Sequence, residues 1–309
     1  MNQPIKPETG AARVPLWRIA GTVLSLALLG YLIYKNWKEF GTALTAIPLQ
    51  NILLAFALLL VSRVCVTARW HFLLRGAKLE ISFWQSLRLT LTGLFAANFL
   101  PSTVGGDLAR LAGAVYLGMD AGLAAASLVV DRLVGMAGMT VMLPFGLAII
   151  ARPAAVLPSG IAAIPGLGWL WKKLSGFIRS AAQSSLYWIQ HPASLGLGLL
   201  ATFGHQTMTY LIIAVLASGA GQSIPFLTIG GLWSINYFVS LAPFAINGLG
   251  VQEVAIAYLY SHFGGLSLEA GLAVAVVWRI LNVLASLPGA FFLPGILSKT
   301  GRTPEVKKV

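Results

Sequence analysis

Long apolar runs separated by short polar stretches dominate the chain. About 20 apolar residues suffice to cross a bilayer, and runs of that length occur at roughly 17–35, 51–69, 122–150, 192–218 and 268–297. No soluble domain fits between them. The pattern predicts an all-α fold, a polytopic integral membrane helix bundle. We expect one membrane domain over 16–298, with polar tails at 1–15 and 299–309.

Two further apolar segments are interrupted by residues that a lipid-facing helix does not need. The first is Asn98–Arg110, N-F-L-P-S-T-V-G-G-D-L-A-R, and the second is Leu241–Glu253, L-A-P-F-A-I-N-G-L-G-V-Q-E. Proline lacks an N–H donor, and broken backbone survives in a membrane only where protein or a water-filled cavity supplies partners. We therefore predict two re-entrant hairpins that meet near the bilayer middle, within about six to eight transmembrane helices. Two kinked helices that pack through small residues are the alternative. The break residues are Pro101, Gly105, Gly106, Pro243, Gly248 and Gly250.

The two broken segments belong to an internal repeat. Aligning Pro101 with Pro243 places Gly106 on Gly248, and V-V-D-R at 129–132 matches V-V-W-R at 276–279. Each half has an apolar entry, a proline, a glycine turn, a short helix and a long helix with a buried arginine. The predicted halves are about 83–150 and 226–297, and paired interruptions of this kind mark the binding sites of transporters.

Composition agrees with a membrane protein and limits its partners. The chain is 57% hydrophobic and only 10% charged, against about 25% charged in soluble proteins. The net charge of +12 indicates cytoplasmic loops and anionic lipid rather than nucleic acid. Arg69, Arg75, Lys78 and Arg88 are interpreted as a basic cytoplasmic loop, which puts both termini in the cytoplasm. Arg63 either snorkels to the membrane surface or faces a cavity.

The sequence offers little for catalysis. Cys65 is the single cysteine, and the four histidines form no pair with metal-ligand spacing. We expect no metal, no cofactor and no catalytic residue, and so a transporter rather than an enzyme.

Charged residues inside the apolar segments are the candidate site, because such residues are costly in a bilayer and are usually paired and functional. Asp107 and Arg110 are three apart on a helix and can touch, although Asp107 could instead only cap its helix. Asp131 needs a partner from another helix, and Arg110 is the candidate. Arg132 and Arg279 match in the repeat and could face one anionic group. The predicted substrate-binding residues are Asp107, Arg110, Asp131, Arg132, Asn247, Glu253 and Arg279.

These residues suggest a lipid head group. A helix N-terminus behind a glycine turn, with arginines nearby, suits a phosphate. The acids beside it suit an amine or a proton, so the sequence predicts a zwitterionic or cationic head group.

Three motifs carry a family resemblance: P-S-T-V-G-G-D-L-A-R, A-A-A-S-L-V-V-D-R-L-V-G and N-G-L-G-V-Q-E. Over roughly 15–298 the chain resembles the flippase-like membrane domain of the lysylphosphatidylglycerol synthase family, and archaeal dolichyl-phosphate glycosylation proteins look similar. In bifunctional members this domain moves the aminoacylated lipid to the outer leaflet, and a soluble C-terminal domain makes that lipid. Because the sequence ends at Val309, the resemblance implies lipid translocation without aminoacyl transfer. Gln252 departs from the family pattern, because many relatives look to have arginine at this position, in a G-V-R-E run.

The sequence therefore predicts a flippase-like transporter of phospholipid or lipid-linked head groups. The alternatives are a membrane-embedded lipid-phosphate transferase, an ion-coupled transporter of a soluble solute, and a scaffold for a lipid or cell-envelope synthase. Expected partners are a membrane lipid, and either a second copy of the chain or a partner lipid synthase, with no nucleic acid. The expected location is the bacterial cytoplasmic membrane.

Overall fold

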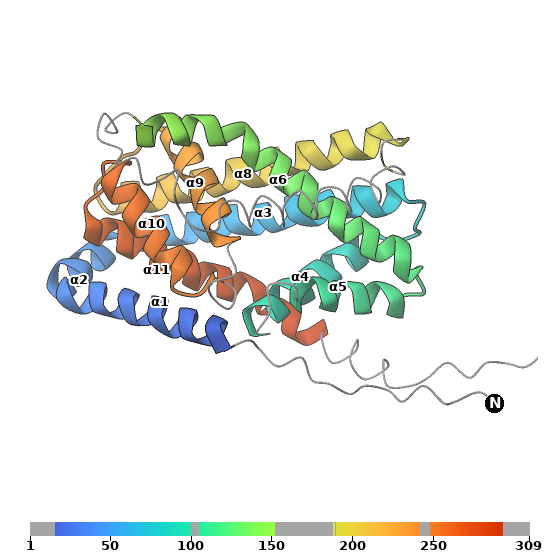
Figure 1. Ribbon diagram of the computed structural model, residues 1–309, viewed down its shortest axis with the longest axis horizontal. Helices are drawn as coiled ribbons and strands as arrows, with labels where there is room; N and C mark the ends of the chain where they lie inside the picture. Colours follow the sequence, from blue (N-terminus) through green and yellow to red (C-terminus); the bar gives the residue numbers. More distant parts are fainter. Residues whose placement is uncertain (1–15, 100–104, 152–187, 189, 242–247, 293–309) are drawn as a thin grey trace, which may run out of the picture.

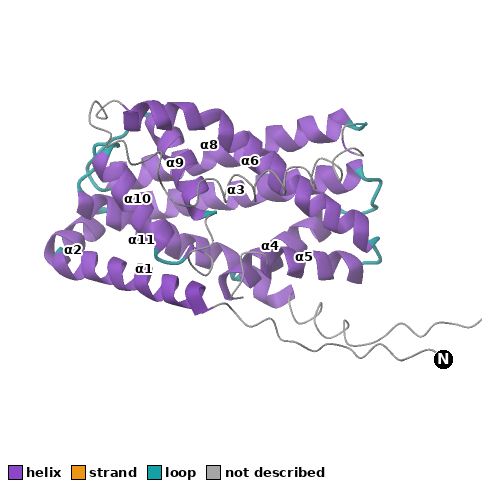
Figure 2. Cartoon of the chain, in the orientation of Figure 1, coloured by secondary structure: helices purple, strands orange, loops and turns teal. Residues whose placement is uncertain are grey.

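The computed structural model describes residues 16–99, 105–151, 188, 190–241 and 248–292. These residues form helices joined by short turns, and none of them forms a strand (Figures 1 and 2). The predicted all-α fold is confirmed. The helices are α1 (Leu16–Lys35), α2 (Trp37–Ala46), α3 (Leu49–Gly76), α4 (Phe83–Phe99), α5 (Gly105–Tyr116), α6 (Ala121–Ala151), α8 (Pro192–Gly219), α9 (Phe226–Ser240), α10 (Val251–His262) and α11 (Leu268–Ser286).

Four helical segments of the described chain are long and apolar enough to cross a membrane. They are Leu49–Gly76, Ala121–Ala151, Pro192–Gly219 and Leu268–Phe292. The predicted first span differs: α1 and α2 satisfy the length and hydropathy criteria only as a pair, which bends by 88° between Lys35 and Trp37. Counting that pair as one span gives five. The chain is an integral membrane protein.

The helix α3 is longer than the predicted run of 51–69, and this difference moves a charged residue. The helix continues to Gly76, so Arg69 lies within it and not in a basic loop as predicted. The connection between α3 and α4 is short, and it holds Lys78 in a left-handed conformation with φ 58°. Arg69 is thus placed to face neighbouring helices.

The helices α3 and α8 pack side by side along the middle of the bundle, and they run in opposite directions (Figure 1). A Cβ at Gly76, the end of α3, would overlap Ser194 at the start of α8. A Cβ at Gly219, the end of α8, would lie 3.1 Å from Nδ2 of Asn51 at the start of α3. Glycine at each end lets the two backbones approach closely.

Two pairs of helices pack at opposite ends of the bundle. The helices α4 and α5 lie together at the right end of Figure 1, and α9 and α10 lie together at the left end. Gly93 and Gly106 make the α4–α5 contact close, because a Cβ at Gly93 would lie 2.8 Å from the Gly106 carbonyl oxygen. In the second pair, Gly248 and Gly250 have φ of 66° and 78°, values that favour glycine.

The second broken segment also contacts α1. Oγ of Ser25, in α1, donates a hydrogen bond of 2.8 Å to the Leu249 carbonyl oxygen, and Gly250 packs against the backbone of the same turn. Protein therefore supplies a backbone partner at this break, as the argument from hydrogen bonding requires. Pro101, Pro243, Asn247 and the tails at 1–15 and 299–309 lie outside the described residues.

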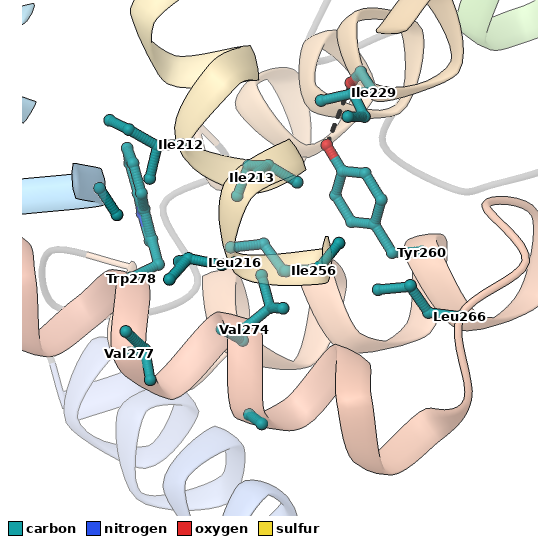
Figure 3. Close-up of a cluster of buried hydrophobic side chains, with 14 of the residues drawn as sticks. Ile212, Ile213, Leu216, Ile229, Ile256, Tyr260, Leu266, Val274, Val277 and Trp278 are labelled. Atoms are coloured by element: carbon teal, nitrogen blue, oxygen red, sulfur yellow. Dashed lines mark hydrogen bonds between the residues drawn. The ribbon is translucent and has the colours of Figure 1, made fainter. Parts of the chain in front are cut away.

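The largest apolar core lies where α8, α9, α10 and α11 meet (Figure 3). Ile212, Ile256 and Val274 are fully buried there. The Tyr260 hydroxyl donates a 3.0 Å hydrogen bond to the Ile229 carbonyl oxygen, so its polar atom is satisfied within the core. These side chains are buried by one another and do not form a surface for lipid.

Glycine at the α6–α9 crossing should be required for stability. A Cβ at Gly231 would lie 2.5 Å from the Gly146 backbone nitrogen, so Gly231→Ala must push the helices apart, and we expect it to cost about 1–3 kcal/mol. The control is Gly196→Ala, where a Cβ meets nothing within 4 Å and helix propensity predicts a gain of up to about 1 kcal/mol. Thermal unfolding in detergent tests this, and equal shifts for both variants would contradict the close crossing.

Candidate functional site

A group of charged side chains from α3, α5 and α6 is buried inside the bundle. Asp131 is 2% exposed and accepts hydrogen bonds from two arginines. Arg69 Nε lies 2.7 Å from Oδ1 of Asp131, and Arg110 Nη1 lies 3.1 Å from Oδ2. The predicted Asp131–Arg110 contact is confirmed. We call Arg69, Asp107, Arg110, Asp131 and Arg132 the first-half cluster.

Asp107 occupies the outer part of the same cluster. Its Oδ1 lies 3.5 Å from Arg110 Nη1, so the predicted i,i+3 contact is present. Its Oδ2 accepts a hydrogen bond from Nε of Arg132 on α6. The side chains of Asp107 and Arg132 are 19% and 35% exposed, which makes this pair the most accessible part of the cluster. Asp107 therefore does more than cap α5, since it holds two arginines.

An aromatic ring supports the cluster. The Arg110 guanidinium carbon lies 4.1 Å from the centroid of the Trp70 ring, a distance typical of a cation–π contact. The Trp70 indole is fully buried and donates a 3.0 Å hydrogen bond to Ser127 Oγ, which fixes the ring. Two other nitrogens of Arg110, Nε and Nη2, have no hydrogen-bond partner in the part of the chain that the structure describes.

A second ion pair joins α10 and α11. Nε of Arg279 donates to Oε1 of Glu253, and Nη2 of Arg279 lies 3.2 Å from Oε1 of Gln252. Glu253 is 3% exposed, and its Oε2 has no hydrogen-bond partner within the described ranges. Arg132 and Arg279, which are predicted to face one anionic group, pair with different acids: Arg132 with Asp107 and Arg279 with Glu253. Gln252 thus binds the same arginine as Glu253.

Arg63 connects the two regions. Its Nη2 donates to Oδ1 of Asn282 on α11, so the side chain points into the bundle and the snorkelling interpretation is wrong. Arg63 makes no ion pair with any acid in the described part of the chain, and its Nε has no hydrogen-bond partner. Arg63 and Arg69 are six residues apart on α3, which corresponds to about 9 Å along the helix.

Sequence reasoning missed Arg69 because the predicted span ended there. The available signal was Trp70-His71-Phe72-Leu73-Leu74, five residues that continue the helical pattern past the arginine. An arginine followed by almost two more helical turns cannot be a loop residue. The structure thus adds Arg69, and with it Trp70, to the candidate site.

The site has no obvious metal centre. Among the described residues, no three histidine, cysteine or acidic side chains come close enough together to hold a metal ion. A surface groove of about 590 Å³ lies at the α3–α4 connection and is lined by Arg75, Lys78, Leu79, Glu80, Ile81, Ser82 and Gln85. None of the ion-pairing residues lines that groove.

The comparisons with known proteins agree with the motifs. A family described as the lysylphosphatidylglycerol synthase TM region matches residues 18–289. The chain belongs to this family. The match includes all the described helices that carry the ion pairs, and it gives this member of the lysylphosphatidylglycerol synthase TM family a membrane role related to lipid. No significant match is found among curated proteins.

Proposed function

We propose that this chain is a flippase-like transporter, built from two inverted halves, that moves a lipid head group through the polar interior of the bundle. The acyl chains would stay in the bilayer.

Helix lengths and ion pairs support the repeat. The helices α3 and α8 have 28 residues each, and α5 and α10 have 12 each. Asp107 and Glu253 are each the third residue of their 12-residue helix, and Arg132 and Arg279 are each the twelfth residue of the helix that follows. In both halves, therefore, the acid at the third position of the short helix pairs with the arginine at the twelfth position of the helix that follows. On this basis the halves would begin earlier than predicted, at about residues 49 and 192.

Reciprocal contacts support an inverted relation. Gly76 and Gly219 each end their helix, and each packs on the third residue of the other, Ser194 or Asn51. Oγ of Ser62 lies 2.6 Å from Nδ1 of His205, and these are both the fourteenth residue of their helix. Such self-complementary contact is the mark of a two-fold axis. Because α3 and α8 run in opposite directions, this axis would lie in the membrane plane, as in many transporters.

The two halves differ at three matched buried positions, and this difference supports the proposed function. Counting along the matched helices, Arg69, Arg110 and Asp131 correspond to Ile212, Ile256 and Trp278. All three counterparts lie in the apolar core of Figure 3. The same packing position is therefore apolar in one half and ionic in the other. Since the fold can fill it with apolar side chains, the buried charges of the first-half cluster are retained for a function.

The ion pairs suggest how a head group would move. Asp107 and Arg132 are the partly exposed members of the cluster, so an entering group can compete with Asp107 for the arginine. An anion that displaces Asp107 from Arg132 would pair with that arginine, and Asp107 would keep its 3.5 Å contact with Arg110. Neither charge would then be left as an isolated buried ion. The two hairpins α4–α5 and α9–α10 would count toward the six to eight predicted membrane segments.

The remaining assignments follow from charge and topology. We place the α3–α4 connection, with Arg75 and Lys78, in the cytoplasm, because short basic loops stay inside. The bacterial cytoplasmic membrane is the proposed location, and a second copy of the chain or a lipid synthase the proposed partner.

Lipid movement in proteoliposomes tests the proposal. We expect head-group-labelled phospholipid to cross faster with the protein than in empty vesicles. Arg110→Gln and Asp131→Asn should slow it about tenfold or more, because a hydrogen bond to a charged group contributes about 1.5–3 kcal/mol. Arg88→Gln is the control, because Arg88 is exposed and its guanidinium lies over the aromatic rings of Trp84 and Phe292. Movement that survives both site variants would remove the cluster from the pathway, and no movement of any lipid would reject the function.

A further inference from the structure

The charges in the interior of the bundle do not balance. Three carboxylates, Asp107, Asp131 and Glu253, are each paired with arginine. Five arginines lie in the same region. Arg69, Arg110, Arg132 and Arg279 pair with these carboxylates, and Arg63 binds Asn282. Two positive charges are therefore in excess among the described residues of this region. Excess charge inside a membrane protein usually marks the pathway of a substrate of opposite sign.

The acids do not offer a site for an amine. Both oxygens of Asp131 are held by arginines, and both oxygens of Asp107 are held likewise. Glu253 has one oxygen without a partner, but its other oxygen binds Arg279. A cationic head group would have to displace an arginine and would add to the positive excess. This differs from the zwitterionic or cationic head group predicted from the sequence.

The cations suit a phosphate. Every basic residue in this interior group is arginine, whose planar fork of donors matches phosphate oxygens better than the point charge of lysine. Two nitrogens of Arg110 and one of Arg63 have no hydrogen-bond partner among the described residues. Arg110 is 8% exposed, so its unpartnered donors are deep in the protein, where an anion can satisfy them.

Arg63 gives the pathway a second position. An amide oxygen of Asn282, and not a carboxylate, holds its guanidinium. A neutral partner binds a cation less strongly than a carboxylate does, so an anion can replace it at lower cost. Arg63 is about 9 Å along α3 from Arg69. Asn282 is one turn from Arg279 on α11, so Arg63 points toward the ion pair of the second half.

We propose that the transported group is an anionic, phosphate-bearing lipid head group, which passes from the first-half cluster to Arg63 along α3. The inference rests on the proposed transport function and adds its substrate class. Arg132 and Arg110 take the phosphate first, and Arg63 with Arg279 takes it next. The head group thus meets arginine on both sides of the bundle centre.

The experiment compares lipids of different charge in the same proteoliposomes. The probes are head-group-labelled phosphatidic acid and polyprenyl phosphate, phosphatidylethanolamine, and lysylphosphatidylglycerol. We expect the two anionic lipids to move at least about tenfold faster than the others, the ratio given by about 1.4 kcal/mol of preference. Faster movement of the cationic lipid would overturn the substrate class and leave the transport function standing. Failure of every lipid to move would reject the transport function itself.

Variants of Arg63 test its role. Arg63→Gln should slow the anionic lipids about tenfold, and Arg63→Lys should recover part of the rate because it keeps charge but loses the fork. Arg75→Gln is the matched control, since Arg75 is an exposed arginine near the end of the same helix. Thermal unfolding of each variant separates a lost rate from a lost fold. An Arg63→Gln protein that is stable and moves anionic lipid normally would overturn the second position.

Inorganic phosphate distinguishes a lipid from a free ion. The same vesicles are loaded with buffer and given labelled phosphate outside. We expect no uptake above empty vesicles, because the proposal requires the acyl chains to remain in the bilayer. Phosphate uptake without movement of anionic lipid would overturn the lipid assignment.

Discussion

Replacement of Asp131 alone by leucine should destabilise the protein by about 3–5 kcal/mol, the cost of breaking a buried ion pair by removing one partner. The Asp131 side chain is 2% exposed. Its Oδ1 lies 2.7 Å from Nε of Arg69, and its Oδ2 lies 3.1 Å from Nη1 of Arg110. Without the carboxylate, two guanidinium groups would face each other inside the bundle. Their repulsion adds to the loss of the hydrogen bonds, so we expect a large fall in the unfolding temperature in detergent.

The matched variant removes Asp131 together with the two arginines that bind it. In Arg69→Ile/Arg110→Ile/Asp131→Leu, all three residues become apolar, like Ile212, Ile256 and Trp278 at the matching positions of the proposed repeat. Replacement of a buried ion triad by apolar residues is often neutral, or stabilising by about 1–4 kcal/mol. We therefore expect the triple variant to be more stable than Asp131→Leu and at least close to the native chain. It should still fail to move lipid.

The comparison separates structure from function. A stable triple variant without transport means that the cluster is retained for activity. If the triple variant is as unstable as Asp131→Leu, the charges hold the fold together and the functional argument from the two halves is wrong. Asp131→Asn, which keeps the shape of the side chain and part of its hydrogen bonding, should fall between the native chain and Asp131→Leu.

The sequence predicted the helical membrane fold because its signals are local. A run of about 20 apolar residues identifies a span by itself, and a proline with paired glycines identifies a break. The predicted end of α3 failed for a related reason. Arg69 stops a hydropathy count, yet the helix continues to Gly76 because Asp131 on another helix neutralises the charge. A partner 62 residues away in the chain leaves no local signal.

The difference between local and distant partners also decides which contacts of the candidate site could be predicted. The Asp107–Arg110 contact follows from helical spacing, so it could be predicted. The pairing of Arg132 with Asp107, and of Arg279 with Glu253, depends on how a short helix packs on the long helix after it. Motif alignment matched the arginines but placed Gly106 on Gly248, whereas the acids Asp107 and Glu253 are four residues out of that register. Only the positions within whole helices bring both acids and both arginines into agreement.

Cysteine labelling should give opposite results at two matched positions, and this outcome tests the inverted halves. Glu80 and Ser223 each lie four residues beyond the end of their 28-residue helix, and both are exposed. In Figure 1 the end of α3 and the end of α8 lie at opposite ends of the bundle. In a Cys65→Ser background, we expect a membrane-impermeant thiol reagent outside intact cells to label Ser223→Cys and not Glu80→Cys.

Disruption of the membrane provides the control, since both variants should then react fully. The physical reason for the all-or-none result is that α3 and α8 are each about 42 Å long at 1.5 Å per residue, enough to cross the hydrocarbon core of about 30 Å. Labelling of both positions from outside would place α3 and α8 ends on one surface and reject the inverted relation. Labelling of Glu80→Cys alone would keep the inversion and reverse the proposed orientation, with the α3–α4 connection outside the cell. Only the first pattern, Ser223→Cys alone, agrees with both the two-fold axis in the membrane plane and the cytoplasmic position of Arg75 and Lys78.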